Sequence, residues 1–387
     1  MKPKTYILNW DSRFNVLVFL VPFCVVCVFV LAGMLSTMQR SSLYLPSYVH
    51  DSFHSASTEL FIRVMGFENA YFVQDKPNIK NVSLSSAGLE LATNIRMGDI
   101  RTLIGNELPG FLLYKYDILT AGQGTDYTNT PVESSPPLEI LLKERGMAKE
   151  QLEQYESNTD APPTANPPKE KNFYIYHTHS WESYFPLLGI TNEPDADKAA
   201  DSKTNITLVG QMLAQELEKN QVGAVVDKTN IGQELKKKGW GTSKAYQASR
   251  TIVQSAMSRD KNLKFFLDLH RDSLRKKNTT ININGTSYAR VVFVLGKENP
   301  NFEQNLEFAK SLHEALKVKY PGLSRGVLGK VGKGVNGVYN QDLAAHSILI
   351  EVGGVDNDME ELKNTIKALA TVITEYYREA EKVNAPN

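Results

Sequence analysis

The apolar residues in the C-terminal half of the chain follow two spacings. Short, continuous apolar runs are typical of strands buried on both faces, and they lie at residues 173–176, 223–226, 264–269, 289–295 and 347–351. Between these runs apolar residues recur every three or four positions, as in amphipathic helices, at 206–217, 245–256, 302–319 and 362–373. This alternation predicts an α/β domain over residues 171–387, with a mixed, mostly parallel sheet flanked by helices.

The N-terminal region has a different pattern. Residues 16–35 carry no charge, and about 20 residues form a helix of roughly 30 Å, enough to cross a bilayer. Lys2, Lys4 and Arg13 precede this stretch, and Arg40 is the first basic residue after it. We therefore predict a cytoplasmic tail at 1–15, an uncleaved single-pass anchor at 16–35 and an extracytoplasmic remainder. A cleaved signal peptide is the alternative, but its apolar core is normally shorter, about 7–15 residues.

Two further regions separate the anchor from the α/β domain. Residues 41–120 have helix-like apolar spacing, which predicts a small, mostly helical juxtamembrane domain. Residues 121–170 form an expected linker, in which four prolines between 162 and 168 favour extended, semi-rigid chain. Both cysteines, Cys24 and Cys27, lie in the apolar segment, so the exported part has no disulfide.

The formal charge of the chain argues against a nucleic-acid partner, and its few histidines indicate a metal site. The 43 Lys and Arg balance 43 Asp and Glu, so no basic field favours nucleic acid. Of seven histidines, His177 and His179 follow the strand at 173–176 directly, and Glu182 lies three positions further on. Imidazole and carboxylate are the ligands that Zn²⁺ takes in catalytic sites. His179 and Glu182 can converge on one ion, with His177 as the alternative to His179.

Two more candidates come at the ends of other predicted strands. His270 follows the run at 264–269, and Glu351 ends the run at 347–351. Ligands bind beyond the carboxyl ends of strands in such sheets, so His270 is a candidate third ligand. A buried carboxylate is costly alone, but beside a cation Glu351 can take and return a proton as general base and acid.

The residues around these candidates offer contacts to a substrate. Arg271 is a candidate for holding a substrate carboxylate, and Asp272 for orienting a ligand histidine, with salt bridges as the alternative for both. Tyr339, Asn340 and Gln341 supply donors for a polar substrate, or else a hydrogen-bonded loop.

Five motifs, in order, carry a family resemblance: YIYHTHSWESY, LDLHRDS, YPGLSRG, YNQDL and LIEVGGVDND. Together with the apolar anchor and ELPGF at 107–111, they closely resemble the stage II sporulation protein P family over nearly the whole chain. The resemblance implies a membrane-anchored, zinc-dependent N-acetylmuramoyl-L-alanine amidase of endospore-forming bacteria. Such proteins hydrolyse peptidoglycan from the mother-cell membrane facing the forespore, thinning the septal wall in engulfment with stage II sporulation proteins D and M. Endopeptidase activity is also ascribed to the family.

Carried over to this chain, the resemblance places the metal ligands in HTHSWES and at His270, and makes Glu351 similar to the amidases' catalytic glutamate. One feature differs: typical zinc amidases have a G-H-G-G loop and a metal glutamate at the start of the next helix. Here that helix begins TNIT at 204–207, so we assign the role to Glu182. The alternatives are a zinc carboxypeptidase or endopeptidase on stem peptides and a non-catalytic wall-binding scaffold.

Overall fold

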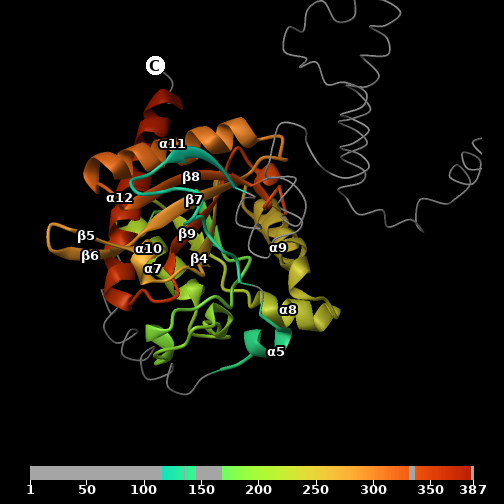
Figure 1. Ribbon diagram of the computed structural model, residues 1–387. Helices are drawn as coiled ribbons and strands as arrows, with labels where there is room; N and C mark the ends of the chain where they lie inside the picture. The colour runs from blue at the N-terminus through green and yellow to red at the C-terminus, as the bar shows by residue number, and fades with distance from the viewer. Residues whose placement is uncertain (1–115, 135, 145–167, 331–335, 385–387) are drawn as a thin grey trace, which may run out of the picture. The chain divides into compact units, whose positions relative to one another are not determined.

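The computed structural model describes residues 116–134, 136–144, 168–330 and 336–384 (Figure 1). The expected cytoplasmic tail, the anchor at 16–35, nearly all of the juxtamembrane domain and much of the linker lie outside these residues. Within the described ranges, no helix has the length and apolar character needed to span a bilayer.

The core of the described part is a seven-stranded sheet with the strand order β1-β8-β7-β9-β4-β2-β3. Its strands are β1 (Tyr116–Ala121), β2 (Phe173–Tyr176), β3 (Ala224–Val226), β4 (Phe265–Asp272), β7 (Val291–Gly296), β8 (Ser324–Lys330) and β9 (His346–Gly354). The neighbours β3–β2, β2–β4, β4–β9 and β7–β8 run parallel, whereas β7–β9 and β1–β8 run antiparallel. The predicted mixed, mostly parallel sheet is confirmed.

Helices cover both faces of the sheet (Figure 1). Apolar residues of α7 (Ile206–Lys219), α11 (Phe302–Lys319) and α12 (Met359–Asn384) form the main core with one face. On the other face, α9 (Ala245–Arg259) packs against aromatic side chains of β2 and β4. The smaller elements are α5 (Leu138–Leu141), η3 (Pro186–Leu188), η4 (Ala196–Lys198), α8 (Ile231–Lys238), η5 (Thr242–Lys244), α10 (Lys276–Thr279), the hairpin β5 (Thr280–Ile283) and β6 (Thr286–Ala289), and η6 (Gln341–Leu343).

The alternation of side chains along the strands decides where polar groups collect. On β4, Leu267 and Leu269 belong to the main core, so Asp268 and His270 point to the opposite face, the one that α9 covers. Glu351 on β9 pairs in register with His270. The polar residues of two adjacent strands therefore lie side by side on the α9 face.

The sheet extends further towards the N-terminus than the expected boundary at residue 171. Strand β1, which lies in the region expected to be helical, pairs with β8 from Tyr116 opposite Lys330 to Ala121 opposite Gly326. The close approach requires glycine, because Gly326 has φ +116° and a Cβ there would lie 2.1 Å from the carbonyl oxygen of Thr120. Residues 122–134, expected as linker, continue from β1 onto the domain; we call them the strap.

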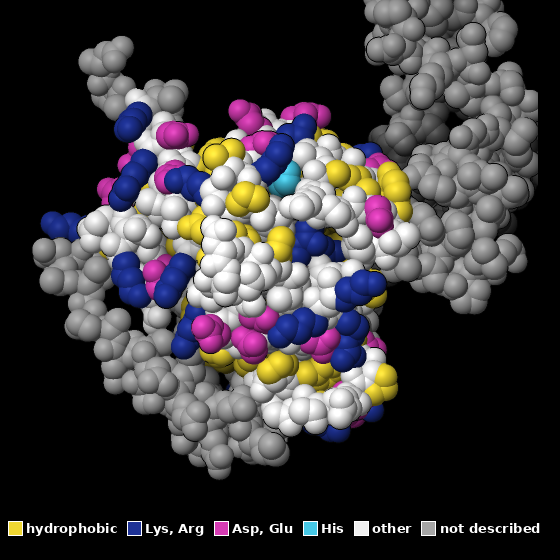
Figure 2. Space-filling model, turned by 60° about the vertical axis from the view of Figure 1, so that its left-hand side comes forward, with side chains coloured by type: hydrophobic (Ala, Val, Ile, Leu, Met, Phe, Trp, Pro, Cys, Tyr) yellow, Lys and Arg dark blue, Asp and Glu magenta, His cyan; other side chains and the backbone are white. Residues whose placement is uncertain are grey.

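The surface of the described part mixes both charges. On the face shown in Figure 2, Lys and Arg side chains lie among Asp and Glu, with small apolar groups between them. Charges of one sign form no large field on this face, in keeping with the zero formal net charge of the chain.

Candidate metal centre

Three of the predicted ligands converge. One ligand atom from each of His179, Glu182 and His270 lies within 4.8 Å of the other two. Nδ1 of His179 is 3.1 Å from Oε1 of Glu182, and Nδ1 of His270 is 3.5 Å from Oε2 of the same carboxylate. All three side chains are buried. Two imidazoles and a carboxylate are the protein ligands of several catalytic zinc sites.

The loop after β2 is tied down so that Glu182 faces the histidines. The N–H of Glu182 donates to the carbonyl of His179 at 3.0 Å, which closes a turn, and Trp181 stacks on the His179 ring with centroids 4.9 Å apart. The N–H of Arg271 donates to Oε2 of Glu182 at 2.8 Å. Burial by itself raises the pKa of Glu182, but His270 and His179 outweigh it and hold the pKa well below its usual range. The carboxyl group is therefore ionised.

Asp268 was not among the predicted site residues, yet it completes the surroundings of His270. Its Oδ1 lies 3.2 Å from Nε2 of His270, on the opposite side of the ring from Glu182. Thr178 fixes Asp268 by donating its N–H at 2.8 Å and its hydroxyl at 2.6 Å. A carboxylate on the second nitrogen orients a metal-binding histidine. Asp268 could have been predicted from the sequence, because it is two positions from His270 on the same strand and therefore shares its face.

Glu351 lies beside this cluster. It is 2 % exposed and pairs in register with His270, and its Oε2 has no hydrogen-bond partner among the described residues. Burial raises the pKa of Glu351 to about 8, against the opposing effect of His270. A carboxyl group with a pKa near neutrality can both accept and donate a proton at working pH.

The structure does not bring His177 into the cluster. Its Nδ1 lies 3.1 Å from the backbone carbonyl of Asp227, and its Nε2 points at α7, where a Cβ on Gly210 would be 2.3 Å away. Burial lowers the pKa of His177 to about 4, so the ring is neutral. Of the two histidines left open by the sequence, His179 is the one whose ring nitrogen faces Glu182.

Arg271 and Asp272 are buried and contact the strap. One Asp272 oxygen accepts the N–H of Val132 at 3.0 Å, and the other forms a salt bridge of 2.5 Å with Arg325 on β8. The Arg271 guanidinium lies 3.4 Å from the hydroxyl of Ser134. These contacts fix the strap against the end of β4. Asp272 forms a salt bridge, the alternative named for it, and the carboxylate beside Nε2 of His270 is that of Asp268. Contact of Arg271 or Asp272 with substrate stays a prediction.

Of the three residues at 339–341, two hold their loop in place and one packs against a ring beside the metal cluster. Asn340 donates to the carbonyl of Tyr246 at 3.1 Å, and Gln341 donates to a backbone carbonyl of β7 at 2.9 Å. Both amides therefore hold the loop in place. The Tyr339 ring packs edge-on against Tyr246, which lies 5.6 Å from the ring of His179. Of the three residues, Tyr339 is the one connected to the metal cluster by ring contacts, and it is connected through Tyr246.

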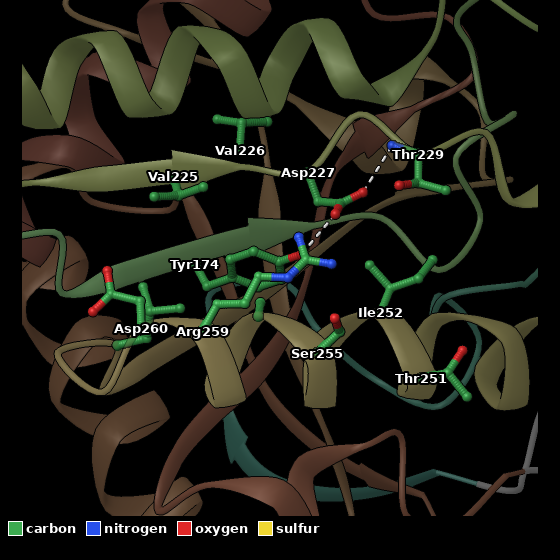
Figure 3. Close-up of a pocket in the computed structure, with 12 residues that line it drawn as sticks. Tyr174, Val225, Val226, Asp227, Thr229, Thr251, Ile252, Ser255, Arg259 and Asp260 are labelled. Atoms are coloured by element: carbon green, nitrogen blue, oxygen red, sulfur yellow. Dashed lines mark hydrogen bonds between the residues drawn. The ribbon is translucent and has the colours of Figure 1, made fainter.

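The hollow in Figure 3 is separate from this centre. It has a volume of about 530 Å³ and lies between β3, the edge strand of the sheet, and α9. Three of its polar residues bond to one another: the Tyr174 hydroxyl donates to Asp227 at 2.6 Å, and Asp227 accepts the N–H of Thr229 at 2.7 Å (Figure 3). None of the candidate ligands lines this hollow.

Fold and site together define a mixed α/β domain with a buried cluster of two histidines and one carboxylate, the donor set of a divalent-metal site. The family model of Stage II sporulation protein P (SpoIIP) matches residues 98–374. The chain is also 45 % identical over 377 residues to "Stage II sporulation protein P" of Bacillus subtilis (strain 168), covering 95 % of this chain and 92 % of the relative. The chain belongs to the stage II sporulation protein P family, and the predicted resemblance is confirmed.

Two solved structures show a weaker likeness. An N-acetylmuramoyl-L-alanine amidase from Clostridium difficile 630 aligns with a TM-score of 0.33 and 15 % identity, over 56 % of this chain and all of its own. A metallo-carboxypeptidase from Burkholderia cenocepacia aligns with a TM-score of 0.30 and 15 % identity, over 57 % of this chain and 60 % of its own. Likenesses this weak leave the chemistry to be argued from the site.

Proposed function

We propose that this protein is a zinc-dependent peptidoglycan amidase that cleaves the amide between N-acetylmuramic acid and L-alanine of the stem peptide. The observation that carries the proposal is the pairing of Glu351 with His270 in register on adjacent strands, beside His179 and Glu182. In this proposal the uncleaved anchor at 16–35 keeps the enzyme at the mother-cell membrane, where it thins the septal wall during engulfment with stage II sporulation proteins D and M.

The three converging side chains fit a zinc ion. Ligand atoms about 2.0–2.2 Å from zinc lie roughly 3.3–3.6 Å apart in a tetrahedral site. The two histidines approach different oxygens of Glu182, since Nδ1 of His179 lies 3.1 Å from Oε1 and Nδ1 of His270 lies 3.5 Å from Oε2. One ligand atom from each of the three residues lies within 4.8 Å of the other two, so the side chains would draw together around a bound ion. The ionised carboxyl group of Glu182 offsets the positive charge, and Asp268 on Nε2 of His270 leaves Nδ1, the nitrogen on the side of Glu182, to face the ion. Bound there, zinc would polarise the amide carbonyl and lower the pKa of water.

Glu351 supplies the proton transfers in this proposal. Its carboxylate takes a proton from the attacking water and then delivers it to the amine nitrogen of L-alanine as the C–N bond breaks. A pKa raised to about 8 suits the second step, because the carboxyl group keeps the proton until the leaving amine takes it. Burial of the site keeps bulk water away from both transfers.

Product analysis on purified muropeptides tests the activity. Amidase action releases intact stem peptides and leaves bare glycan, whereas peptidase action leaves shortened peptides on the sugar. The second outcome would replace the amidase with a stem-peptide carboxypeptidase or endopeptidase, since two histidines and a carboxylate also serve those enzymes.

Glu351→Gln should lower kcat by about 10²–10⁴-fold. Undiminished digestion by this variant would refute the catalytic assignment, and wall binding without any digestion by the unaltered chain would favour a scaffold.

Metal content tests the ligand set independently of activity. His179→Ala and His270→Ala each remove one of the three converging ligands, so the purified proteins should lose bound zinc. His177→Ala is the matched control, because its ring faces Gly210 and the carbonyl of Asp227, and it should retain zinc. Loss of zinc from His177→Ala with retention by His179→Ala would reverse the assignment.

A further inference from the structure

A buried ammonium group lies near the metal cluster without belonging to it. Lys330, at the end of β8, is 4 % exposed, and its Nζ lies 4.5 Å from the ring centre of Tyr116 and 5.6 Å from that of Tyr339. Glu133 of the strap is the one carboxylate in salt-bridge contact with it among the described residues. An ammonium group is costly to bury, and two aromatic faces and one carboxylate compensate only in part. Such an environment suits a cation that receives an anion.

Aromatic rings connect this ammonium group to the metal ligands. The Tyr339 ring meets the Tyr246 ring edge-on, with centroids 5.0 Å apart. Tyr246 in turn stacks parallel to His270 at 6.2 Å. The hydroxyls of Tyr116, Tyr246 and Tyr339 are buried and have no hydrogen-bond partner within the described part of the chain. Unsatisfied buried donors cost free energy, and a bound polar ligand would satisfy them.

Glu133 lies closer to solvent than the ammonium group that it pairs with. Its side chain is 27 % exposed, whereas that of Lys330 is 5 % exposed. The neighbouring residue Val132 is bound at both backbone groups, to Asp272 and to Ser273, at 3.0 Å each. The strap thus presents a partly exposed carboxylate to a buried ammonium group.

We propose that Lys330, held between Tyr116 and Tyr339, is a specificity subsite for a carboxylate of the peptide substrate, and that Glu133 occupies this subsite until substrate displaces it. The inference rests on the proposed function for the identity of the substrate, a peptide with free carboxylates. Exchange of one carboxylate for another leaves the ammonium group paired throughout, which avoids the large penalty of an unpaired buried charge. Tyr116 and Glu133 come from residues before the expected domain boundary, so the N-terminal extension completes the site.

Binding of product peptides tests the subsite without turnover. The full-length, zinc-loaded protein in detergent is titrated by calorimetry with L-alanyl-D-glutamate and with its diamide, in which both carboxylates are neutral. We expect the diacid to bind about 10–100-fold more tightly, the value of a charge-assisted hydrogen bond. Lys330→Met should abolish this preference. Glu133→Gln should strengthen diacid binding about 10-fold, because it removes the internal competitor while keeping the side-chain shape.

One further variant serves as a control, and another replaces Lys330→Met if that protein does not fold. Lys297→Met is the matched control, because Lys297, directly after β7, forms a partly exposed salt bridge with Asp117 of β1 and, among the described residues, no ion pair or ring contact with Tyr116, Tyr339 or Glu133, so it should keep the preference. If Lys330→Met fails to fold, the double variant with Glu133→Gln, which leaves no unpaired charge, replaces it. Equal binding of diacid and diamide by the unaltered protein, or an undiminished preference after Lys330→Met, would overturn the inference and make the pair purely structural. A Lys330-dependent preference without cleavage of muropeptides would overturn the amidase proposal alone.

Discussion

The buried carboxyl group of Glu351 makes the stability of the metal-free protein depend on pH. Burial raises its pKa from 4.5 to about 8. The folded state therefore binds this proton more tightly than the unfolded state, so the stabilisation is complete below the unfolded pKa and is lost as the pH rises through the folded pKa. Between pH 5 and pH 8 one such group removes on the order of 3–4 kcal/mol from the free energy of unfolding.

Glu351→Gln isolates this effect, because the amide is neutral at every pH and has nearly the shape of the protonated acid. In the presence of a chelator we expect the variant and the unaltered protein to have similar stability at pH 5. At pH 8 the variant should be more stable by about 3–4 kcal/mol, or roughly 2–4 °C in Tm for each kcal/mol. Zinc should reduce the difference, because a nearby cation favours the ionised carboxylate.

The assay is thermal unfolding followed by circular dichroism at both pH values, with chelator or with zinc. Glu379→Gln, at an exposed position on α12, is the matched control and should change stability little at either pH. A Glu351→Gln protein that is destabilised equally at pH 5 and pH 8 would show that Glu351 is already ionised in the metal-free fold. The assignment of Glu351 as a proton carrier with a raised pKa would then fail.

Three further substitutions test contacts around the site. Gly210→Ala places a methyl group 2.3 Å from Nε2 of His177 and should cost about 1–3 kcal/mol in urea unfolding, with most of the loss recovered by adding His177→Ala. Asp268→Asn removes the carboxylate beside His270 and should weaken zinc binding about 10–100-fold in chelator competition, so unchanged affinity would deny it an orienting role. Arg325→Met leaves its buried carboxylate partner on β4 unpaired and should cost about 3–5 kcal/mol in the same urea assay, whereas a loss below about 1 kcal/mol would mean that the pair is dispensable.

The central strands were predictable because their side chains are apolar on both faces. Strands β2, β7 and β9 contain continuous apolar runs, and burial on both faces is what such runs indicate. Strand β8 was missed for the opposite reason. It is fully buried, yet it reads SRGVLGK, with two glycines and two basic residues. Its charges are paired inside the protein by Asp272 and Glu133, and hydropathy along the chain does not report pairing with distant residues.

The candidate ligands were largely predictable because strand topology brings them together. Parallel neighbours β2, β4 and β9 place the loop with Glu182, the residue His270 and the residue Glu351 at one edge of the sheet. The choice between His177 and His179 depends on loop geometry instead. Thr178 bonds to Asp268 on β4, and the two histidines on either side of it turn in different directions, one towards α7 and the other towards Glu182.

The proposed subsite around Lys330 could not be predicted from the sequence, because its residues are far apart in the chain. Glu133 and Lys330 are 197 positions apart, and they meet only because β1 adds an antiparallel edge to β8 and the strap then returns over the end of β4. Neither residue lies in one of the five family motifs, and a lone glutamate in a proline-containing segment is most often solvated. The edge strand therefore does more than extend the sheet, since it aligns Tyr116 opposite Lys330 and brings the strap to the metal cluster. A truncation that begins at residue 171 would retain every predicted metal ligand, yet it would lose Tyr116 and Glu133, two of the three side chains that surround the ammonium group of Lys330.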